Sequence, residues 1–316
     1  MRVFYWQSAQ GNFGDDLNLW LWDFLLPGFR NVHPEVLLVG VGTVLNRELL
    51  PAEGRKLVIG SGFGYGALPD VADRRAWDLR CVRGPLTAEK LSLDPALGVI
   101  DPAALVADMP EFSNLPKTTD AVFVPHWRST LDGLWPLASK VAGLTYVSPC
   151  QEAKSVVRAI AQARLVVAES MHAAILADAF RIPWVAVTTS PVINAFKWRD
   201  WTASLGLAYR PRRVPVSSPA EAGAKGVSFW GIPHGLRMPQ PADAGDGAFD
   251  GTVVITPRER HPASPRMIAK RLLAVPSMVG LWQARRACPQ LSADAVLAER
   301  KDRLRAIVAE VRRDYF

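Results

Sequence analysis

Short runs of aliphatic and β-branched residues alternate with polar loops along the first part of the chain. Apolar runs bounded by polar positions predict buried strands, whereas apolar residues at every third or fourth position predict helices. The predicted strands are residues 2–6, 36–41, 56–59 and 79–82, and the predicted helices are residues 17–26 and 87–93. Gly40 and Gly60 lie where two of these runs end, as expected for buried parallel strands followed by loops.

The alternation resumes after residues 110–117, a stretch with two prolines that we interpret as a linker. The elements predicted beyond it are strands at residues 121–124, 144–147, 165–167 and 184–187 and helices at residues 155–163 and 171–179. Alternating strands and helices predict a doubly wound α/β fold. We therefore expect two Rossmann-like domains, residues 1–115 and 116–256, facing each other across a cleft. Ligands bind such sheets at the carboxyl ends of the strands, so the cleft is the expected site.

The pattern loosens after residue 201. Loops are predicted at residues 211–219 and 239–251, a last strand at 253–255, and helices at 267–273 and 292–313. The two helices belong to a C-terminal helical extension, residues 257–316. The last helix carries apolar residues at helical spacing between arginines and lysines. We expect it to dock on the domain core, with an interfacial membrane helix as the alternative.

Composition excludes several classes of protein. Hydrophobic residues make up 49% and charged residues 21% of the chain, which is typical of a globular protein and not of a disordered one. No apolar run approaches the ~18 residues of a membrane-spanning helix, and the first residues lack a signal-peptide pattern. Cys81, Cys150 and Cys288 are too far apart for a clustered zinc site, and their odd number argues against a disulfide framework. We expect a cytoplasmic protein.

The net charge of +7 is concentrated at the C-terminal end. Residues 257–316 hold 13 lysines and arginines against 6 acidic residues, whereas residues 1–256 hold 24 of each. A neutral body with a basic appendage predicts an anionic partner for the appendage, either a phosphate-bearing lipid surface or a nucleic acid. A solvated helix face is the plain alternative.

A run of alternating glycines follows one predicted strand: Gly60-Ser61-Gly62-Phe63-Gly64-Tyr65-Gly66. Backbone amides of such a loop can approach a phosphate, although glycines at strand ends as often serve tight turns. The spacing is not that of a dinucleotide-binding loop, because Tyr65 occupies the position of the last glycine. No phosphate-binding P-loop sequence occurs either. These observations disfavour a dehydrogenase.

The turn after the first predicted strand carries two adjacent carboxylates, Asp15 and Asp16. Gly11 and Gly14 permit a tight loop there, and one carboxylate can cap the following helix. The other is then available to hydrogen-bond a substrate hydroxyl, together with Asn12. A carboxylate pair could also hold a divalent metal, but no third ligand nearby completes such a site, so we expect no metal.

Three residues at predicted strand ends or in the following helices supply positive charge or a titratable proton. Arg83 precedes a helix N-terminus, where a guanidinium can clamp a phosphate or carboxylate. His172 lies in the first turn of the helix at 171–179 and titrates near neutrality. Lys197 lies between aromatic residues that fix the environment of its cation. The plain alternatives are a surface arginine, a structural histidine and simple aromatic packing.

The order of these residues makes the chain resemble the polysaccharide pyruvyl transferases. The resemblance is in particular to the bacterial exopolysaccharide ketal-pyruvate transferases of succinoglycan and xanthan synthesis. The resemblance covers about residues 1–207 and is carried by Asn12-Phe13-Gly14-Asp15-Asp16-Leu17, Arg83-Gly84-Pro85-Leu86-Thr87 with Asp101-Pro102-Ala103, Pro125-His126, Ser170-Met171-His172-Ala173, and residues 194–201. The chain departs from many members at two positions, with Gly84 in place of an aspartate and Ser170 in place of an arginine.

The resemblance implies a fold like the two-domain GT-B glycosyltransferases, phosphoenolpyruvate as donor, and no cofactor or metal. It implies that Arg83, His172 and Lys197 serve donor binding and catalysis, and we expect His126 and Ser170 to line the donor pocket. We expect Asn12, Asp15 and Asp16 to bind the acceptor, which by analogy is a lipid-linked oligosaccharide on the cytoplasmic face. An acceptor of this kind favours contact of the basic C-terminus with an anionic membrane over a nucleic-acid partner.

The predicted function is therefore transfer of pyruvate, as a ketal, from phosphoenolpyruvate to a sugar. His172 is the expected general acid/base, and Asp15 or Asp16 orients or deprotonates the acceptor hydroxyl. Two alternatives remain at this point. A nucleotide-sugar-dependent GT-B glycosyltransferase would be stabilised by a nucleotide diphosphate. A non-catalytic assembly factor would be stabilised neither by a nucleotide diphosphate nor by phosphoenolpyruvate. The sugar modified and the oligomeric state are left open.

Overall fold

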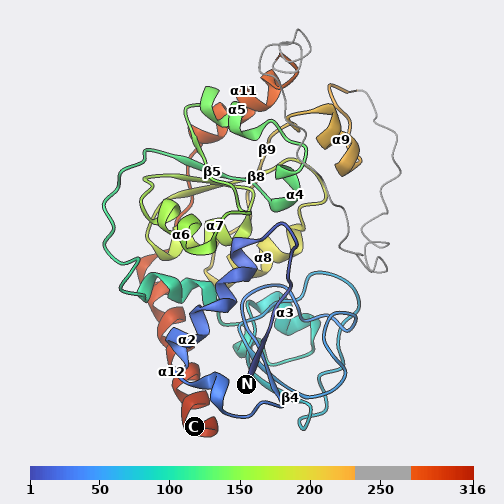
Figure 1. The fold of residues 1–316 in the computed structure, drawn as a ribbon, viewed down its shortest axis with the longest axis vertical. Helices are drawn as coiled ribbons and strands as arrows, with labels where there is room; N and C mark the ends of the chain where they lie inside the picture. The colour runs from blue at the N-terminus through green and yellow to red at the C-terminus, as the bar shows by residue number, and fades with distance from the viewer. Residues whose placement is uncertain (232–271) are drawn as a thin grey trace.

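The computed structural model describes residues 1–231 and 272–316, and contains two parallel β-sheets, one in each half of the chain (Figure 1). The protein is therefore of the α/β class with Rossmann-like sheets, as its alternating pattern predicts. The predicted strand at 253–255, the loop at 239–251 and most of the helix at 267–273 lie outside the described residues. Within the described part, no helix is both long and apolar enough to cross a bilayer.

The first sheet keeps its strands in chain order. Its members are β1 (Arg2–Phe4), β2 (Val36–Val39), β3 (Arg55–Ile59) and β4 (Trp77–Cys81), all parallel. Helices connect only the first pair: α1 (Phe13–Asp16), η1 (Leu17–Leu19), α2 (Leu21–Leu25) and η2 (Phe29–Asn31). The connections from β2 to β3 and from β3 to β4 contain no helix. Because its strands follow chain order, this sheet has no reversal of strand order, in contrast to the doubly wound arrangement that we expected.

The prediction of one helix over residues 17–26 is wrong, because this segment is divided among η1 and α2 and is preceded by α1. The chain breaks at Trp20, whose φ of −138° is not helical. A buried side chain gives the physical reason. Asn18 donates to the carbonyl oxygens of Asp15 and Val41 and accepts from the amide of Val41 and the indole of Trp22. Such bonds compete with regular helix geometry and tie the segment to the loop after β2.

The second sheet reverses its strand order. Its members are β5 (Val122–Val124), β6 (Thr145–Tyr146), β7 (Val166–Ala168), β8 (Trp184–Thr188) and β9 (Arg212–Arg213), in the order β6-β5-β7-β8-β9. The helices around it are α4 (Trp127–Thr130), α5 (Trp135–Val141), α6 (Ala153–Ala161), α7 (Met171–Ala179), α8 (Ala195–Ser204) and α9 (Pro219–Lys225). Because β6 and β7 flank β5 on opposite sides, the carboxyl ends of β5 and β7 form the switch point at which such sheets bind ligands. β9 and the start of α9 fall within residues 211–219, so the predicted loop there is partly wrong.

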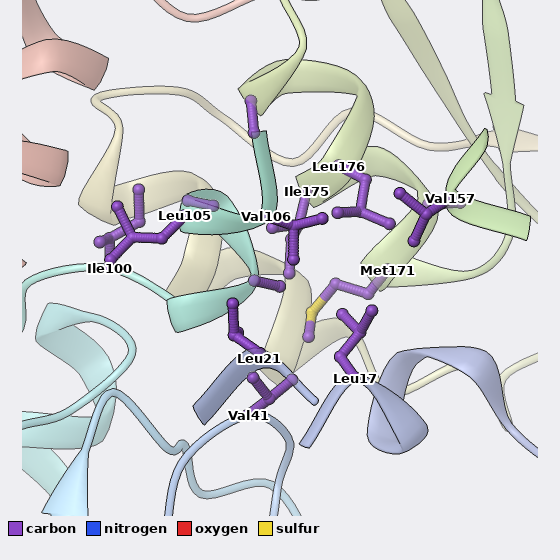
Figure 2. Packing of buried hydrophobic residues seen from close by; sticks show 14 of the residues in the cluster. Leu17, Leu21, Val41, Ile100, Leu105, Val106, Val157, Met171, Ile175 and Leu176 are labelled. Atoms are coloured by element: carbon purple, nitrogen blue, oxygen red, sulfur yellow. The ribbon is translucent and has the colours of Figure 1, made fainter. Parts of the chain in front are cut away.

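One hydrophobic core joins the two halves. All nine residues of α7 are buried, and α7 packs against η4 (Pro102–Asp108), which follows β4, α3 (Pro85–Lys90) and η3 (Pro95–Leu97) in the first half. Figure 2 shows Leu17 and Leu105 from the first half in the same cluster as Met171 and Ile175 from α7. Burying apolar surface of both halves in one cluster fixes their relative position.

The two C-terminal helices lie on different halves of the molecule. α11 (Val275–Arg285) lies beside α5 on the second half, whereas α12 (Asp294–Tyr315) runs back along the first half (Figure 1). α12 buries Leu297, Leu304, Val308 and Val311 in the shared core. The expected docking of this amphipathic helix on the core is thus confirmed. The alternative of an interfacial membrane helix is wrong for α12, because its apolar face is already covered.

Candidate active site

Asp15 is the carboxylate of the first turn that faces the interior between the two halves. Gly11, with a φ of +81°, turns the chain after β1 toward α1. Asp16 accepts a hydrogen bond from the backbone amide of Asn12 at 3.1 Å, so Asp16 caps the turn. Asp15 accepts from the side-chain amide of Asn12. Burial raises the pKa of Asp15 to about 7, with Lys197 opposing that rise and the charges of Asp16 and Asp101 adding to it.

His172 packs closely against the first half of the chain. It lies in the first turn of α7, after β7, and a Cβ at position 14 would lie only 2.0 Å from its Nδ1. Only glycine at position 14 therefore lets the first half pack against this imidazole. Burial, together with the positive charges of Lys197 and Arg83, lowers the pKa of His172 to about 3. In the absence of an anionic ligand the imidazole is neutral at pH 7.

Asp101 faces His172 from the first half. Its Oδ1 caps η4 by accepting from the amide of Ala103, and its Oδ2 lies 3.8 Å from Nε2 of His172. Both of these facing atoms are buried, and neither has a hydrogen-bond partner in the described structure. Burial raises the pKa of Asp101 to about 6. A buried polar pair left unsatisfied in this way is costly, and it is typical of functional sites.

Lys197 brings the positive charge to this cluster. It lies in the first turn of α8, whose N-cap Asn194 accepts from the amides of Phe196 and Lys197 and donates to the carbonyl of Gly64 in the other half. The ammonium lies 4.7 Å from the centroid of the Tyr65 ring. No carboxylate of the described residues pairs with it. Lys197 is therefore a cation available to an anionic ligand.

The glycine-rich run provides space for the cations. A Cβ at Gly62 would lie 2.2 Å from the guanidinium carbon of Arg83, and one at Gly64 would lie 2.7 Å from Cγ of Lys197. These two glycines thus allow the loop after β3 to cover both side chains. This contact explains their presence without a phosphate.

Arg83 is completely buried, in an ion pair between the halves. Its Nε donates to Oδ2 of Asp200 at 3.0 Å, and its other nitrogens donate to Thr43 and to the carbonyl of Phe63. Asp200 also accepts from the amide and hydroxyl of Thr87. The guanidinium thus has no exposed surface in this structure. It contributes its charge to the site, whereas direct contact with a ligand stays a prediction that requires the pair to open.

His126 and Ser170 lie at the switch point, after β5 and β7. Ser170 is the N-cap of α7, with its amide donating to the carbonyl of Val124 and its side chain making no capping bond. His126 caps α4 through Nδ1, which accepts from the amide of Arg128. Burial and the charge of Lys197 lower the pKa of His126. Both side chains thus lie at the ends of the two strands that bind ligands in such sheets.

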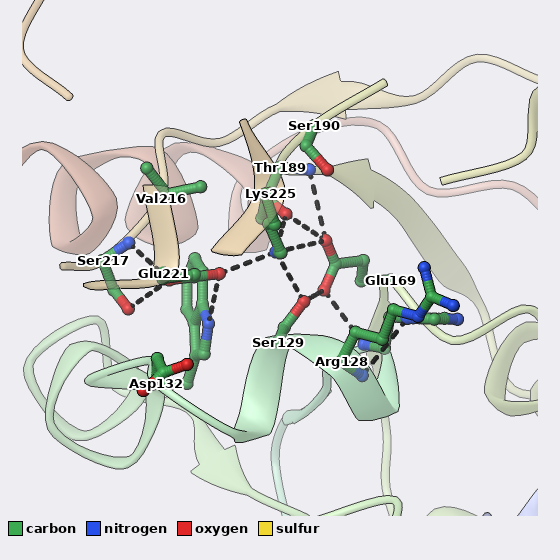
Figure 3. A network of polar contacts seen from close by, with 12 residues as sticks. Arg128, Ser129, Asp132, Glu169, Thr189, Ser190, Val216, Ser217, Glu221 and Lys225 are labelled. Atoms are coloured by element: carbon green, nitrogen blue, oxygen red, sulfur yellow. Dashed lines mark hydrogen bonds and ion pairs between the residues drawn. The ribbon is translucent and has the colours of Figure 1, made fainter. Parts of the chain in front are cut away.

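A buried ionic network holds this switch point together (Figure 3). Glu169 accepts from the amide of His126 at 2.9 Å and from the hydroxyl of Ser129 at 2.6 Å, and its other oxygen accepts from Thr189. Lys225 of α9 donates to Ser129, Thr189 and Glu221. Burial opposes ionisation of Glu169, but Lys225 and these hydrogen bonds lower its pKa. The network fixes the loops after β5, β7 and β8 relative to one another.

Sequence reasoning gave no role to Asp101, Asp200, Glu169 or Lys225. Asp101 belongs to one quoted motif and Asp200 to residues 194–201, so their positions carried a signal. Nothing in the sequence marks Lys225. The described residues contain no group of three or more His, Cys, Asp or Glu side chains that could hold a metal ion, and the expectation of metal-free chemistry stays a prediction.

Two open cavities lie along β1, and Asp15, Asp101, His172 and Lys197 are not among the residues that line them. One, of about 320 Å³, is lined by residues 3–7, Val44 and Leu49, and the other, of about 400 Å³, also borders Tyr5. Burial raises the pKa of Tyr5, and the charges of Asp16 and Asp15 add to the shift. Tyr5 thus borders both cavities and is close enough to Asp15 and Asp16 for their charges to act on its hydroxyl.

Comparison with known proteins identifies the family of the chain. The chain is 60% identical over 316 residues, the full length of both chains, to the succinoglycan biosynthesis protein ExoV of Rhizobium meliloti (strain 1021). No solved structure matches the chain. The model of the family described as polysaccharide pyruvyl transferase matches residues 36–191, which include Arg83, Asp101, His126 and His172. The protein is a transferase enzyme that belongs to the polysaccharide pyruvyl transferase family.

Proposed function

We propose that the protein transfers pyruvate from phosphoenolpyruvate, as a ketal, to a sugar of an exopolysaccharide repeat unit and releases phosphate. The observation that supports this most is the cluster of Asp15, Asp101, His172 and Lys197 between the two halves. It combines an available cation with three titratable groups whose pKa values are shifted by burial. The name of the 60% identical relative suggests succinoglycan, or a polysaccharide similar to it, as the product.

Lys197 is the proposed anchor of the donor. Phosphoenolpyruvate carries a phosphate and a carboxylate, and the ammonium of Lys197 has no carboxylate partner among the described residues. The charge of Arg83 adds to the positive potential at His172. His126 and Ser170, at the ends of β5 and β7, line the same side of the site in this proposal. Fixed positive charge in a buried site stabilises the anionic donor and the departing phosphate.

The reaction requires one proton at carbon and the loss of two from hydroxyls. Protonation of C3 of the donor gives an oxocarbenium-like C2, and the first sugar hydroxyl attacks C2 and loses its proton. Cleavage of the bond between C2 and the phosphate oxygen releases phosphate, and the second hydroxyl closes the ketal with loss of its own proton. The products are inorganic phosphate and the sugar with a pyruvate ketal.

His172 is the proposed general acid/base. Its imidazole is neutral without ligand, since burial and the cations disfavour the protonated form. The negative charges of a bound donor oppose that effect and raise the pKa of His172 toward neutrality, where general acid catalysis is most effective. Asp101, with its unpaired oxygen 3.8 Å from Nε2, is placed to stabilise the imidazolium that forms.

Asp15 is the proposed base for the acceptor hydroxyl, because Asp16 is occupied as a cap. A carboxyl with a pKa of about 7 accepts and releases a proton at neutral pH. The acceptor enters in this proposal along the cavities beside β1, past Tyr5. A lipid-linked oligosaccharide is the proposed acceptor, which brings the enzyme to an anionic membrane.

Thermal unfolding with added ligands tests the choice of donor. We expect phosphoenolpyruvate to raise Tm without added metal, because a ligand at 100 times its Kd stabilises a protein by about 2.7 kcal/mol. A nucleotide sugar should leave Tm unchanged. Stabilisation by a nucleotide sugar alone would instead favour the glycosyltransferase alternative, and a wild-type enzyme that releases no phosphate from phosphoenolpyruvate with any acceptor would contradict the proposal.

A further inference from the structure

Helix α11 has one buried face and one apolar face that is exposed. Ser277, Gly280, Leu281 and Ala284 are buried toward the second sheet. On the other side Val275, Val279 and Trp282 are each more than 40% exposed and follow one another at intervals of four and three residues. This spacing puts the three side chains on one stripe of the helix. α11 thus presents apolar side chains where a solvated helix normally presents polar ones.

The exposed stripe continues beyond the helix. Leu272, just before α11, is 62% exposed, and Trp230 is 59% exposed. The indole of Trp230 donates to the carbonyl of Leu273 at 3.1 Å, which holds it at the start of α11. We call Trp230, Leu272, Val275, Val279 and Trp282 the α11 surface. A contiguous apolar patch of this kind marks a contact site in a protein.

The charged residues of α5 and α11 are all basic. The guanidinium of Arg286 lies 3.9 Å from the centroid of the Trp282 ring. Arg285 lies against the backbone of Ala142 and Gly143 at the end of α5, close in sequence to Lys140. Neither α5 nor α11 contains an acidic residue. Tryptophan and arginine beside an apolar stripe are the combination that suits the boundary between lipid headgroups and acyl chains.

We propose that the α11 surface docks on an anionic membrane, with its apolar stripe in the headgroup region and Arg285 and Arg286 on lipid phosphates. The basic C-terminal extension is divided in this proposal. α11 contacts lipid, whereas α12 is a structural helix whose apolar face lies in the core and whose Lys301 and Arg305 pair with Asp108. The role of this surface rests on the proposed function, because a lipid-linked acceptor would require the enzyme at a membrane. Vesicle binding by the surface can be tested independently of that function.

Vesicle co-sedimentation with the full-length protein tests the surface. Wild-type protein is expected to bind vesicles of phosphatidylglycerol and phosphatidylethanolamine more tightly than vesicles of phosphatidylcholine, with binding weakened by salt. Replacing both Val279 and Trp282 by serine should lower the partition coefficient at least tenfold. Changing Arg285 and Arg286 to glutamate should lower it by a similar factor at low salt, since one basic residue near such a surface contributes about fivefold, or ~1 kcal/mol.

The matched control is the pair Arg312→Glu/Arg313→Glu, which makes the same change in charge on the exposed end of α12. It should retain vesicle binding within about twofold of wild type. Equal loss in the two charge-reversal variants, or wild-type protein that binds no anionic vesicle, would overturn the proposal. So would a dimer that the serine variant breaks without any change in lipid binding, because the surface would then contact a second copy.

Pyruvyl transfer to a water-soluble oligosaccharide, measured on the same variants, separates this inference from the proposed function. We expect the serine variant to keep that activity and its Tm while losing vesicle binding. A variant that loses the activity and keeps vesicle binding would count against a separate docking surface. Failure of the wild-type protein to transfer pyruvate at all would bear on the proposed function alone.

Discussion

The two halves of the molecule differ in topology and contribute opposite kinds of group to the site. The first sheet has its strands in chain order, and its loops supply the carboxyls Asp15 and Asp101. The second sheet reverses at β5 and supplies Lys197, His172 and His126. Burial raises the pKa of the carboxyls and lowers that of the histidines, so both sets move toward their neutral forms.

Because the two halves supply different groups, neither half alone carries a complete site. The second half has the switch point and Lys197, the available cation that suits an anionic donor, and the first half has the proton-accepting groups that suit an acceptor hydroxyl. The polar cluster forms only because Gly14 and Gly64 let the halves approach closely. Variants that act on one half, or on the contact between the halves, therefore separate the two contributions.

Removing the imidazole of the second half should have the largest effect. We expect His172→Ala to lower turnover about 100- to 10,000-fold, the usual contribution of a general acid/base. The shared core around α7 does not depend on this ring, so the variant should remain folded by circular dichroism. Phosphate release from phosphoenolpyruvate measures the loss. Wild-type turnover in a folded variant would remove His172 from the mechanism.

Breaking the ion pair of Arg83 and Asp200 between the halves should mainly lower the free energy of unfolding. Both side chains of Arg83 and Asp200 are fully buried, so Asp200→Asn leaves a buried charge without its partner. We expect it to lower the free energy of unfolding by about 3–5 kcal/mol in urea denaturation. A double variant, Arg83→Met with Asp200→Leu, should lose much less than the sum of the single changes. Additive losses would contradict the pairing.

The same double variant decides how Arg83 acts. If the guanidinium only holds the halves together and adds its charge, the double variant should still bind phosphoenolpyruvate, with a Kd raised less than tenfold. Calorimetric titration measures that constant. Complete loss of binding in the folded double variant would show instead that Arg83 contacts the donor directly, as the sequence resemblance implies.

The raised pKa of Asp15 predicts a pH dependence of stability. A carboxyl with a pKa of 3.8 unfolded and about 7 folded binds its proton more tightly in the folded state. Its contribution to stability is complete below pH 3.8 and is lost as the pH rises to about 7, with a slope of at most about 1.4 kcal/mol per pH unit. Asp15→Asn should flatten the fall between pH 5 and pH 8. Unchanged slopes in urea denaturation would exclude a buried, protonated Asp15.

The elements best predicted from sequence are those defined by apolar runs alone. α7 has the bounds predicted for it, and β2, β3, β7 and β8 lie within one or two residues of theirs. The segment around Asn18 was mispredicted because a buried side chain bonds to the loop after β2, which lies 23 residues away. α8 was not predicted as a helix, since its alternating aromatic and charged residues lack a clear apolar stripe.

Prediction of the site from sequence also fails where residues far apart in the chain pair with one another. His172, Lys197 and Asp15 were identified because each follows a strand in a local motif. The partner of Arg83 is 117 residues away, and that of Glu169 is on α9, so no local pattern could indicate them. Burial of Arg83 is likewise a tertiary property. Sequence thus names candidate residues for the chemistry, whereas the structure is needed to say which of their charges are available to a ligand.

The most direct test of the account is phosphoenolpyruvate binding to two variants of α8. Lys197 faces the site, and Arg199, two residues on, is exposed to solvent, so Lys197→Gln and Arg199→Gln each remove one cation from the same helix. Calorimetric titration should show a Kd at least tenfold higher than wild type for Lys197→Gln and an unchanged Kd for Arg199→Gln. Equal Kd values in wild type and both variants would contradict a donor site formed at Lys197 between the two halves.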